Sequence, residues 1–382
     1  MRVLMISKAC VVGAYQRKLE ELAACPGIEL TLAVPSAWRD ERGLMPLERA
    51  YTQGYSLVVE PLIFNGSFHF HFYPRLQQLL EALRPDVVHM DEEPYNLATW
   101  HALRLAQRSG AKTLFFSWQN ILRQYPFPFN YFEKEVLRLA EAAIVGNREA
   151  VEVWRAKGYA GPISVIPQFG VDPEIFKPPL PSPPGPLSRF TGEGVGGEGF
   201  TIGYAGRLVY QKGVDVLLRA VAQLPATAQV HIIGSGPERA RLQRLAAQLG
   251  LHDRVRIDSL IASTQMPDYF AGLDCLVLPS RTRPTWKEQF GRVLIEAMAC
   301  GVPVIGSTCG EIPNVIGEAG LTFAEEDAAA LASHLRRWQT NPAERAALAI
   351  KGRARVWEHY THQHIAQKTV EVYRSITATP QG

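Results

Sequence analysis

The chain is predicted to be an α/β protein of two domains, each built on a parallel sheet. Short apolar segments recur along it, each followed by a turn and then by residues at helical spacing. This alternation of strand and helix favours a parallel sheet covered on both faces. With 382 residues the chain exceeds the usual size of one hydrophobic core, and its hydrophobic fraction of 47% is typical of a soluble globular protein.

Both halves of the chain follow this alternation. In the first half, strands are expected at 3–6, 29–34, 56–60, 86–90, 113–116, 143–145 and 164–166, and helices at 16–24, 75–83, 98–108 and 133–141. In the second half a strand, a loop and a helix recur four times, with strands beginning near residues 200, 229, 275 and 302. Ligands bind beyond the carboxyl ends of parallel strands, so the loops that follow these strands are candidate binding loops.

Two carboxylates flank the start of a predicted helix in the second half. The apolar strand at 275–278 ends at Pro279, and a loop leads to Glu288 and then to a helix that contains Glu296. A helix start offers free backbone N–H groups and a partial positive charge, which suit a phosphate. We interpret Glu288 as a contact to a transferred sugar and Glu296 as a contact to a ribose diol. The alternative is a solvated loop acid and a helix-face acid.

Two cations follow an earlier strand of the same half. Arg207 and Lys212 lie five residues apart in the turn after the strand that begins near residue 200. Two cations at this spacing suit a diphosphate, although each taken alone is more often a surface charge. Together with Glu288 and Glu296, they predict a nucleotide-sugar site.

Five motifs occur in a fixed order in this half. They are Gly-Arg-Leu followed after three intervening residues by Lys-Gly (206–213), Gly-Ser-Gly-Pro (234–237), Glu-Gln-Phe-Gly (288–291), Glu-Ala-Met-Ala-Cys-Gly (296–301) and Gly-Glu-Ile-Pro (310–313). In this order they closely resemble the family 4 retaining glycosyltransferases of GT-B fold. The resemblance covers nearly the whole chain and is densest between residues 203 and 323.

The resemblance implies two Rossmann-like domains with parallel sheets facing a central cleft. Residues 1–177 would bind the acceptor and 201–358 the nucleotide sugar, with a Pro- and Gly-rich linker at 178–200 and a helix at 359–382 that packs back on the first domain. The implied enzyme is a retaining hexosyltransferase with a UDP- or GDP-linked donor. Its acceptor would be a glycan, a lipid-linked or a small molecule, as in cell-surface polysaccharide or glycolipid synthesis.

The resemblance also assigns roles to individual residues. Those expected to act on the transferring sugar and its phosphate are Glu288, Arg207, Lys212 and Asp91. Those expected to contact the rest of the donor are Gly13, Gly206, Gly234, Gly236, Ile261, Phe290, Gly291 and Glu296. Relatives usually have a glycine pair where this chain has only Gly13, and a plain turn is the alternative there. Ile261 is a base contact by position, although Ser259 replaces the usual glycine nearby.

Asp91 lies in an acidic trio at the end of a first-half strand. Relatives often have a second histidine at this position that contacts the sugar, and we expect Asp91 to take that contact. Glu92 and Glu93 are expected to be solvated. A metal site at the trio is the weaker alternative, because the chain has no Asp-x-Asp motif and hard cations favour convergent oxygens.

No metal or other cofactor is expected. Breaking the bond to the anomeric carbon leaves a nucleotide diphosphate whose growing charge must be stabilised. Arg207, Lys212 and the helix N–H groups near Phe290 and Gly291 can supply that stabilisation.

Composition argues against several partners. The net charge of +3 is spread over both halves, so neither carries a basic face for nucleic acid. The five cysteines form no Cys-x-x-Cys pair, which favours reduced thiols in the cytosol. The first eight residues are charged too early for a signal peptide, and no apolar stretch reaches 18 residues. We expect a cytoplasmic enzyme, with peripheral contact at the inner membrane face as a further option.

An aromatic segment at 125–132 precedes a predicted helix. We interpret it as a loop folded onto its own domain, and the alternative is a contact to the acceptor or a membrane surface. Phe68, Phe70, Phe72 and Tyr73 are candidates to join it. His69 and His71 alternate with them as in a half-exposed strand, and no ligand role is assigned to either.

Three rival classes share parts of this pattern. A GT-B nucleotide-sugar enzyme without transfer, such as an epimerase, is the main alternative, although it would lack this glutamate loop. A nicotinamide oxidoreductase is rejected, because the Gly-x-Gly-x-x-Gly match at 194–199 has neither a strand before it nor a helix after it. A catalytically silent binding protein would keep both glutamates only by accident.

Overall fold

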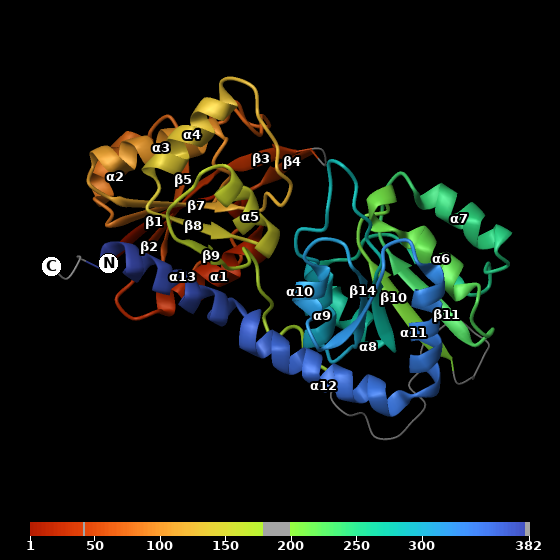
Figure 1. Cartoon of the computed structure of the whole chain (residues 1–382). Helices are drawn as coiled ribbons and strands as arrows, with labels where there is room; N and C mark the ends of the chain where they lie inside the picture. Colours follow the sequence, from red (N-terminus) through yellow and green to blue (C-terminus); the bar gives the residue numbers. More distant parts are fainter. Residues whose placement is uncertain (41–42, 179–198, 379–382) are drawn as a thin grey trace. The chain divides into compact units, whose positions relative to one another are not determined.

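The chain forms two compact α/β units (Figure 1). The computed structural model describes residues 1–40, 43–178 and 199–378. The first unit comprises Met1–Gly170 and the segment that begins at His362, and the second comprises Val171–Thr361. Almost all of the predicted linker lies outside the described residues. The main sheet of each unit is entirely parallel, which confirms the predicted fold class.

The first unit is built on a seven-stranded parallel sheet in the order β5-β2-β1-β6-β7-β8-β9. Its strands are β1 (Arg2–Ile6), β2 (Glu29–Pro35), β5 (Ser56–Glu60), β6 (Val87–Met90), β7 (Lys112–Ser117), β8 (Ala142–Val145) and β9 (Ile163–Val165). Its helices are α1 (Arg17–Ala24), α2 (Leu76–Leu83), α3 (Leu97–Arg108), α4 (Phe129–Leu139), α5 (Arg148–Ala156) and α13 (His362–Thr377). All seven predicted strands are present, because central parallel strands read as continuous apolar runs.

Three local features of this unit differ from the sequence prediction. A two-stranded antiparallel hairpin, β3 (Ala37–Asp40) and β4 (Gly43–Pro46), follows β2 and was not predicted. Helix α4 begins at Phe129 instead of residue 133, directly after Pro128, so half of the aromatic segment is helical. No strand forms at residues 68–71, although the alternating pattern predicted one.

The order of strands in the first sheet reverses between β1 and β6. These two strands are neighbours, with Val3 opposite Val87 and Ile6 opposite Met90. Strands that follow β1 in sequence and strands that follow β6 add to opposite edges. Such a reversal leaves an opening beyond the carboxyl ends of the two central strands, which is where ligands bind in open α/β sheets.

The second unit repeats this topology with six parallel strands in the order β12-β11-β10-β13-β14-β15. Its strands are β10 (Phe200–Ala205), β11 (Ala228–Ile233), β12 (Val255–Asp258), β13 (Cys275–Leu278), β14 (Val304–Ser307) and β15 (Gly320–Phe323). Its helices are α6 (Val214–Val221), α7 (Arg239–Gln248), α8 (Met266–Ala271), α9 (Arg292–Ala299), α10 (Ile312–Ile316), α11 (Ala328–Thr340) and α12 (Pro342–His359). Here the order reverses between β10 and β13.

One glycine allows the loops after β10 and β13 to touch. Gly213 starts α6 with a left-handed φ of +65°, which favours glycine. A Cβ atom on it would run into the carbonyl oxygen of Pro279, the first residue after β13. Only a residue without a side chain therefore lets the two loops approach.

Helix α13 is tied to the first sheet by a buried hydrogen bond. The helix packs along α1, and its apolar residues join the core on that face of the sheet. Toward the carboxyl end of the helix, the Tyr373 hydroxyl lies 2.7 Å from Nδ1 of His89 on β6. Burial lowers the pKa of His89 to about 4, with the charges of Asp91 and Lys18 acting in opposite directions. His89 is therefore neutral at pH 7.

We predict that this histidine makes the first unit acid-sensitive. The unfolded chain returns the His89 pKa to near 6.5, so between pH 6.5 and pH 4 the unfolded state binds a proton that the folded state does not. The stabilisation is present above pH 6.5 and is lost as the pH falls through about 4. Between pH 7 and pH 4.5 the free energy of unfolding should fall by about 2–3 kcal/mol from this source.

Urea unfolding monitored by hydrogen exchange in β1 and β6 peptides would measure this loss. His89→Gln keeps a neutral polar side chain at every pH, so its free energy of unfolding should depend less on pH by that amount. Equal pH dependence in the two proteins would contradict the prediction.

Candidate active site

An ion pair joins the ends of the two central strands of the second sheet. Lys212 belongs to a 3-10 turn (Tyr210–Lys212) that follows β10, and Glu288 lies in the loop between β13 and α9. Its carboxylate oxygen Oε2 lies 2.6 Å from the Lys212 ammonium and accepts a hydrogen bond of 2.8 Å from the Ser280 hydroxyl. The side chains are only 19% and 9% exposed. The structure thus brings together two of the residues that the sequence singled out.

The backbone of Glu288 is fixed as firmly as its side chain. Its carbonyl oxygen accepts a hydrogen bond of 3.0 Å from the Glu311 N–H, and its own N–H lies 3.5 Å from the Cys309 sulfur. Gly310 has a left-handed φ of +55°, and a Cβ atom there would collide with the Glu288 carbonyl. The Gly-Glu-Ile-Pro motif therefore holds the loop that carries Glu288.

A second buried ion pair supports the same loop and was missed by the sequence analysis. The Arg281 guanidinium is 2% exposed, forms an ion pair with Asp215 at the start of α6, and lies 4.3 Å from the centre of the Tyr210 ring. Asp215 and Arg281 are 66 residues apart, and in the sequence each resembles an ordinary surface charge. Only the packing of the two loops shows that they are partners.

Glu296 occupies the second turn of α9. Its carboxylate is buried and forms an ion pair with Arg292, one turn earlier, with 2.7 Å between Oε1 and Nε. Burial raises the pKa of Glu296, and the Arg292 charge partly opposes this. The helix begins after Gly291, next to Phe290, so all four residues belong to one helix start. Ribose binding by Glu296 stays a prediction.

The other donor residues predicted in this unit follow neighbouring strands. Gly206 and Arg207 follow β10, Gly234 and Gly236 follow β11, and Ile261 follows β12. Because carboxyl ends of parallel strands share one edge of a sheet, these residues lie along the edge that carries Lys212 and Glu288. Arg207 is exposed there. The arrangement is compatible with an extended ligand, and the individual roles stay predictions.

The first unit has a pocket of about 240 Å³ beyond the ends of β1 and β6. Lys8, after β1, and the acidic trio Asp91, Glu92 and Glu93, after β6, contribute to its lining. Aromatic rings form much of the rest, among them Tyr15, Trp38, Phe68, Phe116 and Trp118. The pocket therefore occupies the point of strand reversal in the first sheet, as the Lys212–Glu288 pair does in the second.

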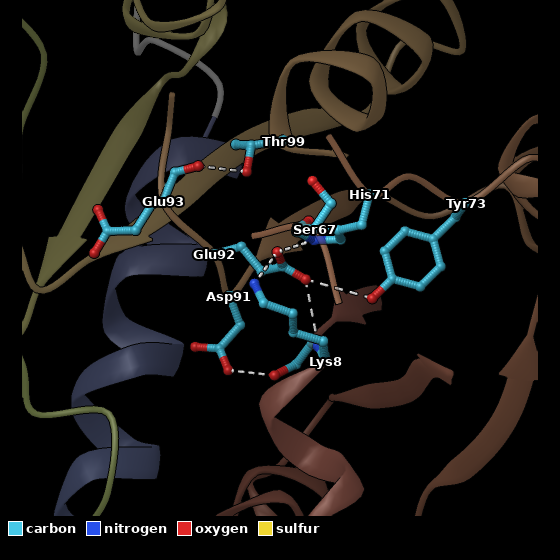
Figure 2. A network of polar contacts seen from close by, with 9 residues as sticks. Lys8, Ser67, His71, Tyr73, Asp91, Glu92, Glu93 and Thr99 are labelled. Atoms are coloured by element: carbon cyan, nitrogen blue, oxygen red, sulfur yellow. Dashed lines mark hydrogen bonds and ion pairs between the residues drawn. The ribbon is translucent and has the colours of Figure 1, made fainter. Parts of the chain in front are cut away.

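Glu92 is the centre of a buried polar network in this pocket (Figure 2). Its carboxylate forms an ion pair with Lys8 and lies 2.6 Å from Nε2 of His71, and the Tyr73 hydroxyl is 3.4 Å away. Burial favours a raised pKa, but the nearby charges of His71 and Lys8 outweigh it and lower the pKa of Glu92 to about 2. The expectation that Glu92 is solvated is wrong, because the segment that contains His71 covers it.

The other two acids of the trio are also engaged. Asp91 accepts a hydrogen bond of 2.7 Å from the Ser7 hydroxyl and lies 3.6 Å from the Lys18 ammonium. Glu93 accepts hydrogen bonds from the Ser117 hydroxyl at 2.6 Å and the Trp118 N–H at 2.8 Å. Burial raises the pKa of Glu93 to about 7. The expectation of a solvated Glu93 is therefore wrong as well, and a sugar contact by Asp91 stays a prediction.

Gly13 has an internal partner. Its N–H donates a hydrogen bond of 2.6 Å to the carboxylate of Glu48, and a Cβ atom on Gly13 would meet the side chains of Glu48 and Ala50. A donor phosphate that approached this N–H would have to displace Glu48. The predicted contact of Gly13 with the donor stays a prediction.

Most of the aromatic segment packs on the first unit. Tyr125 stacks on Tyr95 with ring centres 4.2 Å apart, and Phe129 lies 4.8 Å from the His69 ring. Phe127 is 80% exposed. The interpretation of a segment folded onto its own domain is confirmed for these rings, and contact with a membrane stays a prediction. In the ranges that the structure describes, no helix combines the length and apolarity needed to cross a bilayer.

Two family models match the chain, one in each half. The model described as glycosyl transferases group 1 matches residues 191–355, and the one described as a glycosyl transferase 4-like domain matches residues 12–169. The first therefore includes the Lys212–Glu288 pair, and the second includes most of the pocket in the first unit.

Curated relatives match over shorter ranges. The D-inositol 3-phosphate glycosyltransferase of Stackebrandtia nassauensis is 30% identical over 264 residues, which are 65% of this chain and 57% of the relative. A GDP-mannose-dependent phosphatidylinositol monomannoside mannosyltransferase of Mycolicibacterium smegmatis is 35% identical over 155 residues, 38% of this chain and 40% of the relative. The matches thus span less than two thirds of the length of these relatives.

Solved structures share the fold over nearly the whole chain. HepE of Anabaena in complex with UDP has a TM-score of 0.73 at 18% identity, covering 98% of this chain and 100% of that one. Sucrose-phosphate synthase of Thermosynechococcus elongatus has a TM-score of 0.70 at 22% identity, covering 98% and 99%. These similarities show a GT-B fold. The two family models, which together match most of the chain, show that it belongs to the glycosyltransferases, with the group 1 family matched in its second half.

Proposed function

We propose that this protein transfers a hexosyl unit from a UDP- or GDP-linked sugar to a hydroxyl group of a glycan, a lipid-linked or a small-molecule acceptor. The observation that carries the proposal is the Lys212–Glu288 pair at the strand reversal of the second sheet. It combines a cation suited to a diphosphate with a carboxylate suited to sugar hydroxyls. The names of the relatives, which include a GDP-mannose-dependent enzyme, and the UDP complex of HepE support the donor class.

The proposed chemistry follows from the charge that develops on the leaving group. The bond between the anomeric carbon and the phosphate oxygen breaks, and the acceptor oxygen bonds to the same carbon. The leaving diphosphate takes the proton of the acceptor hydroxyl. Lys212, Arg207 and the backbone N–H groups at the start of α9 would bind the diphosphate oxygens. Fixed donors of this kind stabilise developing charge without reorganisation. Attack from the same face as departure, with retained configuration, is part of the proposal.

Glu288 has two roles in this proposal. Without a donor it is the partner of Lys212, and Ser280 and the Glu311 N–H hold it in place. When a diphosphate binds Lys212, the glutamate is released to contact the sugar. Acceptor binding is assigned to the first unit, and synthesis of a cell-surface polysaccharide or glycolipid is the setting we propose.

We predict release of a nucleoside diphosphate that depends on an acceptor and needs no divalent metal. The full chain would be incubated with UDP- and GDP-linked hexoses and a mixture of glycan and lipid-linked acceptors, with EDTA or with magnesium. Because Lys212 and Arg207 can neutralise the diphosphate, release should be equal in both conditions. Loss of activity in EDTA with recovery in magnesium would contradict metal independence. A changed hexose without any transfer would instead indicate the epimerase-like alternative.

We predict different kinetic effects for the two glutamates. Glu296→Gln should chiefly raise the donor KM, because a ribose contact is made about equally in the ground and transition states. Glu288→Gln should chiefly lower kcat, by about a hundredfold if about 2.7 kcal/mol of transition-state stabilisation is lost. Glu318→Gln is the matched control, since Glu318 is an exposed acid of the same unit. Steady-state kinetics with the two patterns exchanged would require the two roles to be exchanged.

A further inference from the structure

The pocket of the first unit combines aromatic walls with carboxylates. Trp38, Phe68 and Trp118 contribute rings, and Asp91 and Glu93 contribute carboxyl groups. Aromatic faces pack against the C–H faces of sugar rings, while carboxylates accept hydrogen bonds from hydroxyl groups. This chemistry suits a polyhydroxylated ring.

Cations at the pocket are already paired with its acids. Among the described residues that line the pocket, Lys8 is the single lysine or arginine, and it forms an ion pair with Glu92. Its ammonium also lies 5.4 Å from the centre of the Trp38 ring and 4.8 Å from that of Phe68. Behind the lining, Lys18 faces Asp91 and His71 faces Glu92. Lys8 and Lys18 therefore each have a carboxylate as a charged partner.

A phosphate group would be poorly accommodated here. Phosphates are bound best by the fork of an arginine or by several unengaged N–H donors, and no arginine is among the described residues that line the pocket. A phosphate would have to take Lys8 from Glu92, and it would then face the carboxyl groups of Asp91 and Glu93 at short range. An uncharged hydroxylated ring requires neither change.

We propose that this pocket binds the acceptor of the transfer reaction, and that the acceptor group bound here is an uncharged polyhydroxylated ring and not a phosphate ester. The inference rests on the proposed function only in calling the bound ligand the acceptor. The chemical class of the ligand rests on the pocket alone.

The test uses two matched pairs of ligands: glucose with glucose 6-phosphate, and myo-inositol with myo-inositol 3-phosphate. Each would be titrated into the full chain labelled with 5-fluorotryptophan, in the presence of UDP. The 19F signals of Trp38 and Trp118 report the pocket and are assigned with Trp38→Phe and Trp118→Phe. The signal of Trp338, which is buried in the second unit, serves as the internal reference. Both neutral rings should shift the two pocket signals with at least tenfold lower Kd than their phosphate esters.

A charge variant links the preference to a particular acid. Glu93→Gln removes one carboxyl charge with little change in shape, so at pH 8 it should improve phosphate-ester binding relative to the neutral ring by roughly fivefold to tenfold. Glu152→Gln, an exposed acid on α5, is the control and should leave the ratio unchanged. Glu93→Gln with an unchanged ratio would contradict the proposed role of the carboxyl charge.

The binding result is independent of catalysis. If no donor is turned over but the neutral rings still shift the Trp38 and Trp118 signals, the proposed function fails and the assignment of the pocket holds. Tighter binding of either phosphate ester, or no shift with either neutral ring, would overturn the inference even if transfer is observed.

Discussion

The ion pair between Lys212 and Glu288 is the interaction on which the candidate site depends. It crosses the strand reversal of the second sheet, where β10 and β13 are neighbours. The contact requires Gly213 to approach Pro279 and Gly310 to approach Glu288, so two glycines without room for a side chain permit it. A partly buried charge needs a partner of opposite charge. In the absence of a nucleotide sugar, Lys212 and Glu288 are each other's partner. In the proposed reaction a diphosphate would replace Glu288 in that role.

The two units share one sheet topology but differ in the chemistry of the residues at the strand reversal. Each sheet reverses its strand order at its centre, and each places a lysine and a glutamate from the two central loops in contact there. In the second unit Arg207 and Lys212 both follow β10, at the edge of the sheet that carries the pair, which suits an anionic ligand. In the first unit Glu92 is joined by three further acids, Asp40, Asp91 and Glu93, and aromatic rings line the same pocket, which suits hydroxyl groups. The difference lies in the loops and not in the strand order.

Much of the fold could be predicted because buried parallel strands are continuous apolar runs. The residues Lys212 and Glu288 could be found from the sequence because they belong to motifs at the ends of such strands. Contacts made by irregular segments could not. Glu92 looked solvated because nothing in the sequence shows that His71, 21 residues earlier, folds over it. The Arg281–Asp215 pair was missed for the same reason, since long-range partners of surface-like charges become visible only when loops pack.

The central claim is tested most directly by a double-mutant cycle of Lys212 and Glu288 in which the affinity for UDP or GDP is measured. Calorimetry would compare the wild type, Lys212→Met, Glu288→Gln and the double variant. Because Glu288 competes with the diphosphate for Lys212, Glu288→Gln should tighten binding, and should do so less when Lys212 is already absent, with a coupling of about 1–2 kcal/mol. Weaker binding by Glu288→Gln, or an equal effect in both backgrounds, would contradict the account.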